Sequence, residues 1–299
     1  MESGLLKRYK VHPNKRLGQN FLVSRTVLKK IIKAGELKSS DIVLEIGPGL
    51  GILTKAIAKK VKKVIAVEKD KKLANILKEE LDNNGIKNVK IIQADILKIE
   101  NWKLTAYSPR ARPYRENWKL KIENFKVVAN LPYYITAPVI RMFLESAKPP
   151  ESMVLMVQKE VAQRICPCPP KLKERRRGKT PKMSILAVSV QFYAKPEMIS
   201  YISKKSFWPQ PKVDSAIIKI VPRQFGVPVS CQFREQFFRI VRAGFSQPRK
   251  QLINNLYKTL EVSRKEVETW LKGNKIQPTQ RAETLSVNNW IALTKTFKF

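Results

Sequence analysis

The sequence predicts an α/β fold with a largely parallel β-sheet, followed by a small all-α domain. Over residues 41–157, short β-branched runs alternate with longer periodic segments, as strands and crossover helices do in such a sheet. Beyond Pro222 the periodic segments are helical throughout and are separated by glycine and proline. We therefore expect a first domain over residues 1–222, with a basic N-terminal arm, and a helical second domain over residues 223–299.

Seven strands account for the β-branched runs of the first domain. They are expected at residues 42–46, 64–67, 89–92, 125–129, 153–157, 198–203 and 215–221. Residues 206–211 join the last two strands, and the prolines in this connection exclude a helix there. These two strands are expected to complete one edge of the same sheet.

Helices fit the periodic segments between the strands and after them. In the first domain they are expected at residues 52–60, 71–83, 138–147 and 159–165. Asp70 is placed to cap the second of these. In the second domain they are expected at residues 233–243, 249–260, 264–271 and 287–296.

Two segments of the first domain resemble insertions. The tetrapeptide Asn-Trp-Lys-Leu at residues 101–104 recurs at residues 117–120, so a local duplication accounts for the long connection over residues 101–124. Residues 166–182 hold seven Lys and Arg but one acid, with four prolines, which indicates an exposed basic loop. This loop could bind the phosphate groups of a nucleic acid, or it could simply be solvated.

Charge is the strongest signal in the composition. The chain has 59 Lys and Arg against 24 Asp and Glu, a net charge of +35, whereas solubility of a small domain needs roughly 2 to 8. A polyanionic partner, nucleic acid first, is therefore expected. Because the sequence contains neither an apolar stretch of about 20 residues nor a signal-peptide core, we expect a cytoplasmic protein with no membrane partner.

The sequence does not support a metal site or chemistry by a nucleophile and its base. Cys166, Cys168 and Cys231 lack the spacing of zinc ligands, so we expect reduced thiols and no metal. His12 is the sole histidine and lies far upstream in the basic arm. Acyl or phosphoryl transfer is therefore not expected.

Three features at successive strand ends indicate a nucleoside-type ligand. Residues 45–51 read Glu-Ile-Gly-Pro-Gly-Leu-Gly, which leaves bare backbone where a ligand can approach. A tight strand-to-helix connection would give the same pattern. Glu68 is placed to bind two ribose hydroxyls and Asp95 to contact an adenine. Either acid alone could instead be a solvated strand-end residue or a helix cap.

The sharpest local motif is Asn-Leu-Pro-Tyr-Tyr at residues 130–134, directly after the fourth strand. The Asn130 carboxamide oxygen and the Leu131 carbonyl, turned by Pro132, can each accept a hydrogen of an adenine 6-amino group. The nitrogen lone pair then leaves ring conjugation, and direct methyl transfer needs no strong base. Tyr133 and Phe207 could hold an unstacked adenine between them, although ordinary core packing is the plainer interpretation of such aromatics.

With these residues in place, the sequence resembles the KsgA-type family of rRNA adenine dimethyltransferases along nearly its whole length. The supporting motifs are Arg-Leu-Gly-Gln-Asn-Phe-Leu at 16–22, the glycine loop at 45–51, Asn-Leu-Pro-Tyr at 130–133, Gln-Lys-Glu-Val at 158–161, Phe-Trp-Pro-Gln-Pro-Lys-Val-Asp-Ser at 207–215, and the C-terminal segments 244–256 and 281–286. Pro248 departs from the pattern, which usually has arginine there.

The resemblance implies a class I, Rossmann-like methyltransferase fold with a mostly parallel seven-stranded sheet and S-adenosylmethionine as cofactor. The positions that match the family's cofactor-binding residues are Asn20, Leu22, Gly47, Glu68, Asp95 and Asn130. Those that match its catalytic and base-holding residues are Asn130, Leu131, Pro132, Tyr133 and Phe207.

The resemblance also implies a substrate. The family's usual reaction is dimethylation of two adjacent adenines in a hairpin loop near the 3′ end of small-subunit rRNA, coupled to ribosome biogenesis, by a monomer acting on the immature subunit. A large-subunit methyltransferase of the antibiotic-resistance type is the nearest competing hypothesis, and the C-terminal segments argue against it. The basic loops leave open a ribosome-assembly or RNA-binding factor without catalysis, and the shared Asn-Pro-aromatic chemistry leaves open a DNA adenine methyltransferase.

Overall fold

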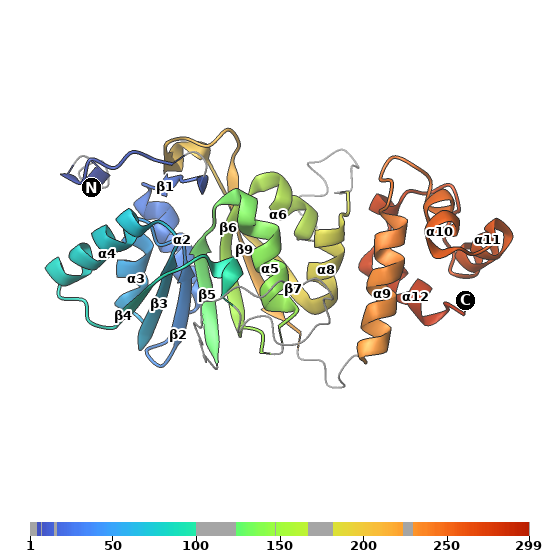
Figure 1. Ribbon diagram of the computed structural model, residues 1–299, viewed down its shortest axis with the longest axis horizontal. Helices are drawn as coiled ribbons and strands as arrows, with labels where there is room; N and C mark the ends of the chain where they lie inside the picture. Colours follow the sequence, from blue (N-terminus) through green and yellow to red (C-terminus); the bar gives the residue numbers. More distant parts are fainter. Residues whose placement is uncertain are drawn as a thin grey trace. The chain divides into compact units, whose positions relative to one another are not determined.

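The chain forms two compact units in a computed structural model (Figure 1). The structure describes residues 5–6, 8–14, 17–99, 124–146, 148–166, 182–223 and 230–298. The first unit comprises Met1–Ala162 and Ala194–Pro222, and the second comprises Gln163–Tyr193 and Arg223–Phe299. The division expected at residue 222 differs from this one in residues 163–193, which group with the helical unit. The duplicated segment and the basic loop lie, apart from their end residues, outside the described residues.

A seven-stranded sheet forms the centre of the first unit, in the order β4-β3-β2-β5-β6-β9-β7 (Figure 1). The strands are β2 (Ile42–Ile46), β3 (Lys63–Glu68), β4 (Val89–Gln93), β5 (Phe125–Asn130), β6 (Ser152–Gln158), β7 (Ala194–Ile202) and β9 (Ser215–Pro222). All seven predicted strands are present, and β9 and β7 complete one edge. Every pair from β4 to β6 is parallel, whereas β9 is antiparallel to both of its neighbours. The predicted α/β class with a mostly parallel sheet is therefore confirmed.

The register of the parallel strands brings their carboxyl ends to one edge of the sheet. Ile46 of β2 pairs with Val67 of β3, and Glu68 pairs with Gln93 of β4. The central strands are almost continuously apolar and buried, as expected for strands covered on both faces. The loops that follow β2, β3, β4 and β5 consequently lie side by side, where ligands of α/β proteins bind.

Helices cover both faces of this sheet: α2 (Arg25–Gly35), α3 (Ile52–Ala58), α4 (Lys71–Asn83) and α5 (Thr136–Leu144). Helix α6 (Lys159–Ile165) follows β6 directly, and the division between the two units falls within it. On one face, buried side chains of α2 and α3 share a cluster with Val43, Val64 and Val128. On the other face, Phe143 of α5 packs against Phe125 of β5, with ring centroids 6.1 Å apart. Each helix predicted for this part of the chain is present.

Two helix starts show how capping sets the local structure. The Asp70 carboxylate accepts hydrogen bonds from the backbone N–H groups of Lys72 and Leu73, so the predicted N-cap of α4 is confirmed. Helix α5 begins at Thr136, two residues before the predicted start at Pro138. Proline fits within this first turn because the backbone N–H it lacks would have no partner inside the helix.

Among the elements of the first unit that the sequence does not predict are one α-helix and two short strands. Helix α2 begins after Ser24, whose side chain accepts a hydrogen bond from Val27 N, and it buries one face against the sheet. Strands β1 (Phe21–Leu22) and β8 (Phe207–Trp208) form a separate antiparallel pair in which Leu22 lies opposite Phe207. Two-residue strands are too short for a periodic signal, and only the fold brings them together.

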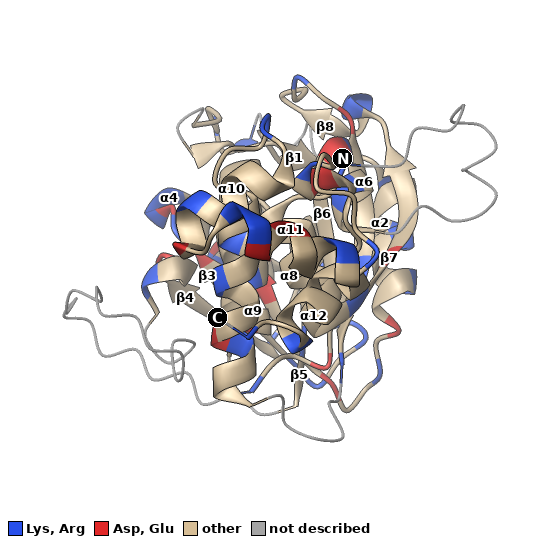
Figure 2. Cartoon of the chain, turned by 90° about the vertical axis from the view of Figure 1, so that its right-hand side faces the viewer, with Lys and Arg blue, Asp and Glu red and all other residues tan. Residues whose placement is uncertain are grey.

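The second unit is built from α8 (Ile185–Tyr193), α9 (Cys231–Gly244), α10 (Leu252–Leu260), α11 (Arg264–Gly273) and α12 (Val287–Lys295). The four helices predicted after Pro222 are present, and α8 was not predicted. The apolar core of the second unit includes the fully buried Trp290 and a stack of Phe192 on Phe237, with ring centroids 4.2 Å apart. Lysine and arginine residues occur along α9, α10 and α11 (Figure 2).

Neither a membrane-spanning helix nor a metal cluster occurs in the described residues. No described helix is both long and apolar enough to cross a bilayer. Likewise, no three His, Cys, Asp or Glu side chains within this part of the chain are grouped as metal ligands would be.

Candidate active site

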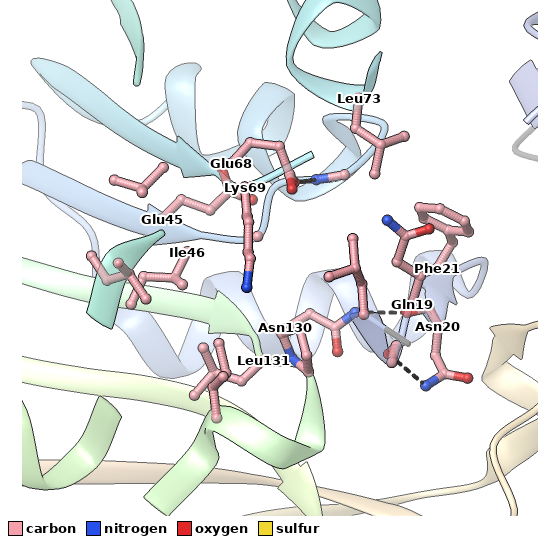
Figure 3. Close-up of a pocket in the computed structure, with 18 of the residues that line it drawn as sticks. Gln19, Asn20, Phe21, Glu45, Ile46, Glu68, Lys69, Leu73, Asn130 and Leu131 are labelled. Carbon is pink, nitrogen blue, oxygen red and sulfur yellow. Dashed lines mark hydrogen bonds between the residues drawn. The ribbon is translucent and has the colours of Figure 1, made fainter. Parts of the chain in front are cut away.

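A cavity opens at the carboxyl ends of β2, β3, β4 and β5 in the first unit (Figure 3). All the residues predicted for the site line this one cavity: Asn20, Leu22, Gly47, Glu68, Asp95, Asn130, Leu131, Pro132, Tyr133 and Phe207. They come from segments up to 187 positions apart in the chain, from Asn20 to Phe207. The structure therefore brings the predicted residues together, while the role of each stays a prediction.

The glycine loop leaves one wall of the cavity without side chains. Gly47 and Gly49 have φ values of 67° and 58°, a left-handed conformation that favours glycine. A Cβ atom on Gly49 would lie 3.3 Å from the Phe21 ring, closer than ordinary van der Waals contact. Gly47 and Gly49 line the cavity, so the backbone of the loop is exposed to a ligand there. Helix α3 begins directly after the loop, at Ile52.

Glu68 is held rigidly at the end of β3. One carboxylate oxygen accepts a hydrogen bond from Gly49 N at 3.1 Å, and the other accepts one from Asp70 N at 2.9 Å. Burial raises the pKa of Glu68, and the backbone hydrogen bonds oppose this shift. Each oxygen keeps a lone pair for a further donor, so the carboxylate can receive two hydroxyl groups.

Glu45 is a second buried acid in the cavity, and the sequence did not indicate it as a site residue. Its side chain is 1 % exposed, and within the described residues its Oε2 atom has no hydrogen-bond partner. Burial raises the pKa of Glu45 to about 8, and the nearby Glu68 carboxylate adds to the increase. A positively charged ligand would favour the ionised form of this group.

Replacing Glu45 by Gln tests this raised pKa. Because the pKa is about 8 in the folded chain and 4.5 as the ordinary value, Glu45 lowers the free energy of unfolding as pH rises between these values, by at most about 1.4 kcal/mol per pH unit. We expect the melting temperature of Glu45→Gln, relative to the unsubstituted chain, to increase between pH 6 and pH 9. The exposed Asp82→Asn is the control, and an equal pH response of both variants would contradict the assignment.

The Asp95 carboxylate, just after β4, is held in place by two contacts. Its Oδ1 accepts a hydrogen bond from Leu97 N at 3.1 Å, and its Oδ2 lies 3.0 Å from Nζ of Lys69. The hydrogen bond to Asp95 raises the pKa of Lys69. Asp95 therefore caps a short helix and also faces the cavity, so the cap and the ligand contact proposed from the sequence are compatible.

Asn130 is oriented by the segment that precedes α2. Its Nδ2 donates a hydrogen bond to the backbone carbonyl of Asn20 at 3.1 Å (Figure 3). The side chain of Asn20 donates in turn to the carbonyl of Gly18. This contact fixes the amide nitrogen of Asn130 on the protein side and leaves the carboxamide oxygen as an acceptor for a ligand.

Tyr133 and Phe207 line the same cavity in different environments. The Tyr133 hydroxyl lies 2.7 Å from Oγ of Ser215, and burial raises the pKa of Tyr133. Phe207 is 3 % exposed and lies in β8 opposite Leu22. Both rings are held by neighbouring strands, although the sandwich of a base between them stays a prediction.

Other lining residues were not assigned to the site from the sequence, among them Gln19, Glu45, Lys69, Ile96 and Tyr134. About half of the unassigned lining residues are immediate neighbours of assigned residues, such as Lys69 after Glu68 and Ile96 after Asp95. For these residues, a position next to an assigned residue in the sequence is the signal that could have identified them.

The cavity combines carboxylates, which accept hydrogen bonds and carry negative charge, with apolar walls. This combination suits a cationic nucleoside. Glu68 offers two oxygens to ribose hydroxyls, while the buried, unpartnered Oε2 of Glu45 suits a positive charge. Apolar residues such as Leu22, Leu50 and Ile96 can cover a purine. The residues present therefore fit S-adenosylmethionine, which carries a ribose, an adenine and positive charge.

The chain is similar to known proteins along nearly its whole length. Residues 11–298 match the family model described as ribosomal RNA adenine dimethylase. A "Ribosomal RNA small subunit methyltransferase A" from Dehalococcoides mccartyi is 41% identical over 286 residues, which cover 96% of this chain and 89% of the relative. A protein of the same name from Geobacillus thermodenitrificans is 37% identical, with coverage of 97% and 92%.

Solved structures give the same fold. The 23S rRNA methyltransferase ErmE superposes with a TM-score of 0.67 at 26% identity, covering 92% of this chain and 98% of that one. A dimethyladenosine transferase from Plasmodium falciparum superposes with a TM-score of 0.65 at 26% identity, covering 91% and 95%. The chain therefore belongs to the ribosomal RNA adenine dimethylase family, methyltransferases of the class I fold that use S-adenosylmethionine as methyl donor.

Proposed function

We propose that this chain dimethylates the 6-amino groups of two adjacent adenines in a hairpin loop near the 3′ end of small-subunit rRNA. The observation that carries the proposal is the orientation of Asn130, whose amide nitrogen is bound by the Asn20 carbonyl. Its carboxamide oxygen is thereby available to an amino group in a cavity that also suits S-adenosylmethionine. Relatives at 41% and 37% identity carry the small-subunit name.

Activation of the adenine amine follows from two acceptors. The Asn130 oxygen and the Leu131 carbonyl each accept a hydrogen bond from the amino group, which draws the nitrogen lone pair out of conjugation with the ring. The bound cofactor supplies an electrophilic methyl group. No general base is assigned to this step, because positioning and hydrogen bonding are sufficient to make the nitrogen a nucleophile. The proton that the methylated nitrogen then loses passes to solvent.

The cofactor is assigned to the residues at the strand ends. Glu68 binds the ribose hydroxyls and Asp95 the adenine of the cofactor, while Gly47 and Leu22 shape the wall beside it. Asn20 contributes from the segment before α2, and its carbonyl also holds Asn130. The support for these roles is that all five residues line one cavity.

Tyr133 and Phe207 are assigned to the target base. An adenine in a loop is unpaired, so its edge and both faces can be reached by a protein. The hydrogen bond between the hydroxyl groups of Tyr133 and Ser215 keeps the tyrosine ring in place for stacking. A base held this way presents its 6-amino group to Asn130 and Leu131.

Substitutions at Tyr133 separate the ring from its hydroxyl. Tyr133→Ala removes the stacking surface, worth about 1–3 kcal/mol per base, so we expect the KM for RNA to rise roughly 5- to 150-fold. Tyr133→Phe keeps the ring and loses the hydrogen bond with Ser215, so we expect a smaller rise in the KM for RNA. Steady-state methyl transfer measures both, and equal losses in the two variants would contradict the stacking role.

The substrate is assigned to the small subunit, with an immature particle as the form that is methylated. The sequence relatives at 35–42% identity are named for the small subunit, whereas the 23S enzyme is a structural neighbour at 26%. The helical second unit, with its Lys and Arg residues, is assigned to RNA docking (Figure 2). A monomer acting in the cytoplasm is part of the same proposal.

Reverse transcription tests the subunit assignment. Two methyl groups on the 6-amino nitrogen block base pairing, so the copied strand stops beside a dimethylated adenine. We expect paired stops near the 3′ end of small-subunit rRNA in cells that express this chain, and none in cells lacking such an enzyme. Stops in large-subunit rRNA instead would replace the small-subunit assignment by that of a resistance-type methyltransferase.

A further inference from the structure

A second depression lies beside the active-site cavity, between α2 and α3 of the first unit. It is a groove of about 890 Å³, within the range of known ligand sites. Its floor is made of Leu28 and Ile32 from α2 and of Ile52 and Ala56 from α3, all half-buried. Ile52 also lines the active-site cavity, so the two hollows adjoin at the start of α3.

Cationic side chains line both walls of this groove. On α2, Arg25, Lys29 and Lys33 follow one another at intervals of four residues and therefore form one stripe along the helix. On the side of α3 the cations are Lys55, Lys59 and Lys60. Lys29, Lys33, Lys59 and Lys60 are exposed, and none of the four forms an ion pair with another described residue.

The groove has almost no compensating negative charge. Residues 25–35 and 52–58 contain no acid. The acidic residue that lines the groove is Glu80, which is buried and already bound by Lys55 at 2.8 Å and by the Tyr9 hydroxyl at 2.9 Å. Like charges spaced four apart, as Lys29 and Lys33 are, destabilise a helix by about 0.2–0.5 kcal/mol, and an anion lying against these two lysines would offset that cost.

We propose that this groove binds the sugar-phosphate backbone of an RNA strand adjoining the target loop, an inference that rests on the proposed function. Phosphates match the two cationic walls, and riboses can lie on the aliphatic floor. No aromatic side chain lines the groove, so base stacking is not expected there and the contact is independent of sequence. Because Ile52 borders both hollows, a strand in the groove lies next to the active-site cavity.

The test compares two fourfold variants with equal charge changes. In the groove variant, Lys29, Lys33, Lys59 and Lys60 are replaced by Gln. In the control variant, four exposed lysines of the first unit that do not line the groove are replaced by Gln: Lys72, Lys78, Lys90 and Lys195. The probe is a synthetic hairpin with two adjacent loop adenines and a single-stranded extension, and its Kd is measured over a range of salt concentrations.

The expected result is a specific loss of phosphate contacts. In the groove variant we expect the slope of log K against log salt to fall in magnitude by roughly 3, since each single-strand phosphate contact contributes about 0.7. In the control variant we expect a change of less than about 1. Because none of these lysines lines the active-site cavity, kcat at saturating RNA and cofactor should be unchanged in both variants.

Lysine acetylation gives an independent readout that does not depend on substitution. Bound hairpin should protect Lys29, Lys33, Lys59 and Lys60 from acetylation, while Lys72 and Lys195 stay reactive. Equal slopes in the two variants, or unchanged reactivity of the groove lysines with RNA bound, would overturn the proposal. Failure of the proposed function is a different outcome, in which the unsubstituted chain binds the hairpin but transfers no methyl group to it.

Discussion

Replacing Asn130 by Ala is expected to lower kcat for methyl transfer by about 10²–10³-fold, the usual cost of removing one preorganised hydrogen-bonding group from an active site. The substitution deletes the acceptor for an adenine amino hydrogen and the hydrogen bond to the Asn20 carbonyl. It leaves the apolar walls of the cavity and the lysine and arginine residues of the chain unchanged. We therefore expect the Kd for RNA to change little.

Asn130→Asp is the companion variant. A carboxylate retains an acceptor oxygen but replaces the amide nitrogen by a second oxygen that cannot donate to the Asn20 carbonyl, so the side chain loses its fixed orientation. We expect activity between that of Asn130→Ala and the unsubstituted chain. Single-turnover methyl transfer with bound RNA measures the chemical step, and full activity in Asn130→Ala would remove Asn130 from the mechanism.

Replacing Glu68 by Gln is expected to weaken cofactor binding by roughly 10- to 100-fold, since a hydrogen bond to a charged group contributes about 1.5–3 kcal/mol. In the structure both carboxylate oxygens accept backbone N–H groups, from Gly49 and Asp70. Glutamine has the same shape but places an NH₂ group against one of these donors. The variant therefore disturbs the glycine loop as well as the ribose contact.

Calorimetric titration with S-adenosylhomocysteine measures the effect of Glu68→Gln. Asp82→Asn, an exposed acid on α4 that does not line the cavity, is the control for a change of one charge. We expect no change in its Kd. Comparable losses in both variants would indicate a general effect of charge and would contradict a direct role for Glu68.

Much of the first unit follows from local sequence patterns. The β-branched runs identify all seven strands of the sheet, because buried parallel strands are apolar on both faces. Once the strands are placed, the residues at their carboxyl ends are known to share one edge. This is why Gly47, Glu68, Asp95 and Asn130 could be assigned to one site before their positions in space were known.

Other features depend on contacts between distant parts of the chain, which no local pattern contains. Strand β1 forms only because β8, nearly 190 positions later, pairs with it. The raised pKa of Glu45 depends on complete burial beneath the glycine loop. Helix α8 belongs to the helical unit, where Val188 and Phe192 lie in the apolar core and Phe192 stacks on Phe237, a contact that composition does not reveal.

Transfer of labelled methyl groups from S-adenosylmethionine to purified ribosomal particles tests the central claim most directly. Immature small subunits, mature small subunits, large subunits and free rRNA are compared, and the labelled RNA is digested to nucleosides. The proposed function predicts N6,N6-dimethyladenosine from the RNA of immature small subunits. RNA binding without label in any particle would contradict it and would favour a non-catalytic role in ribosome assembly.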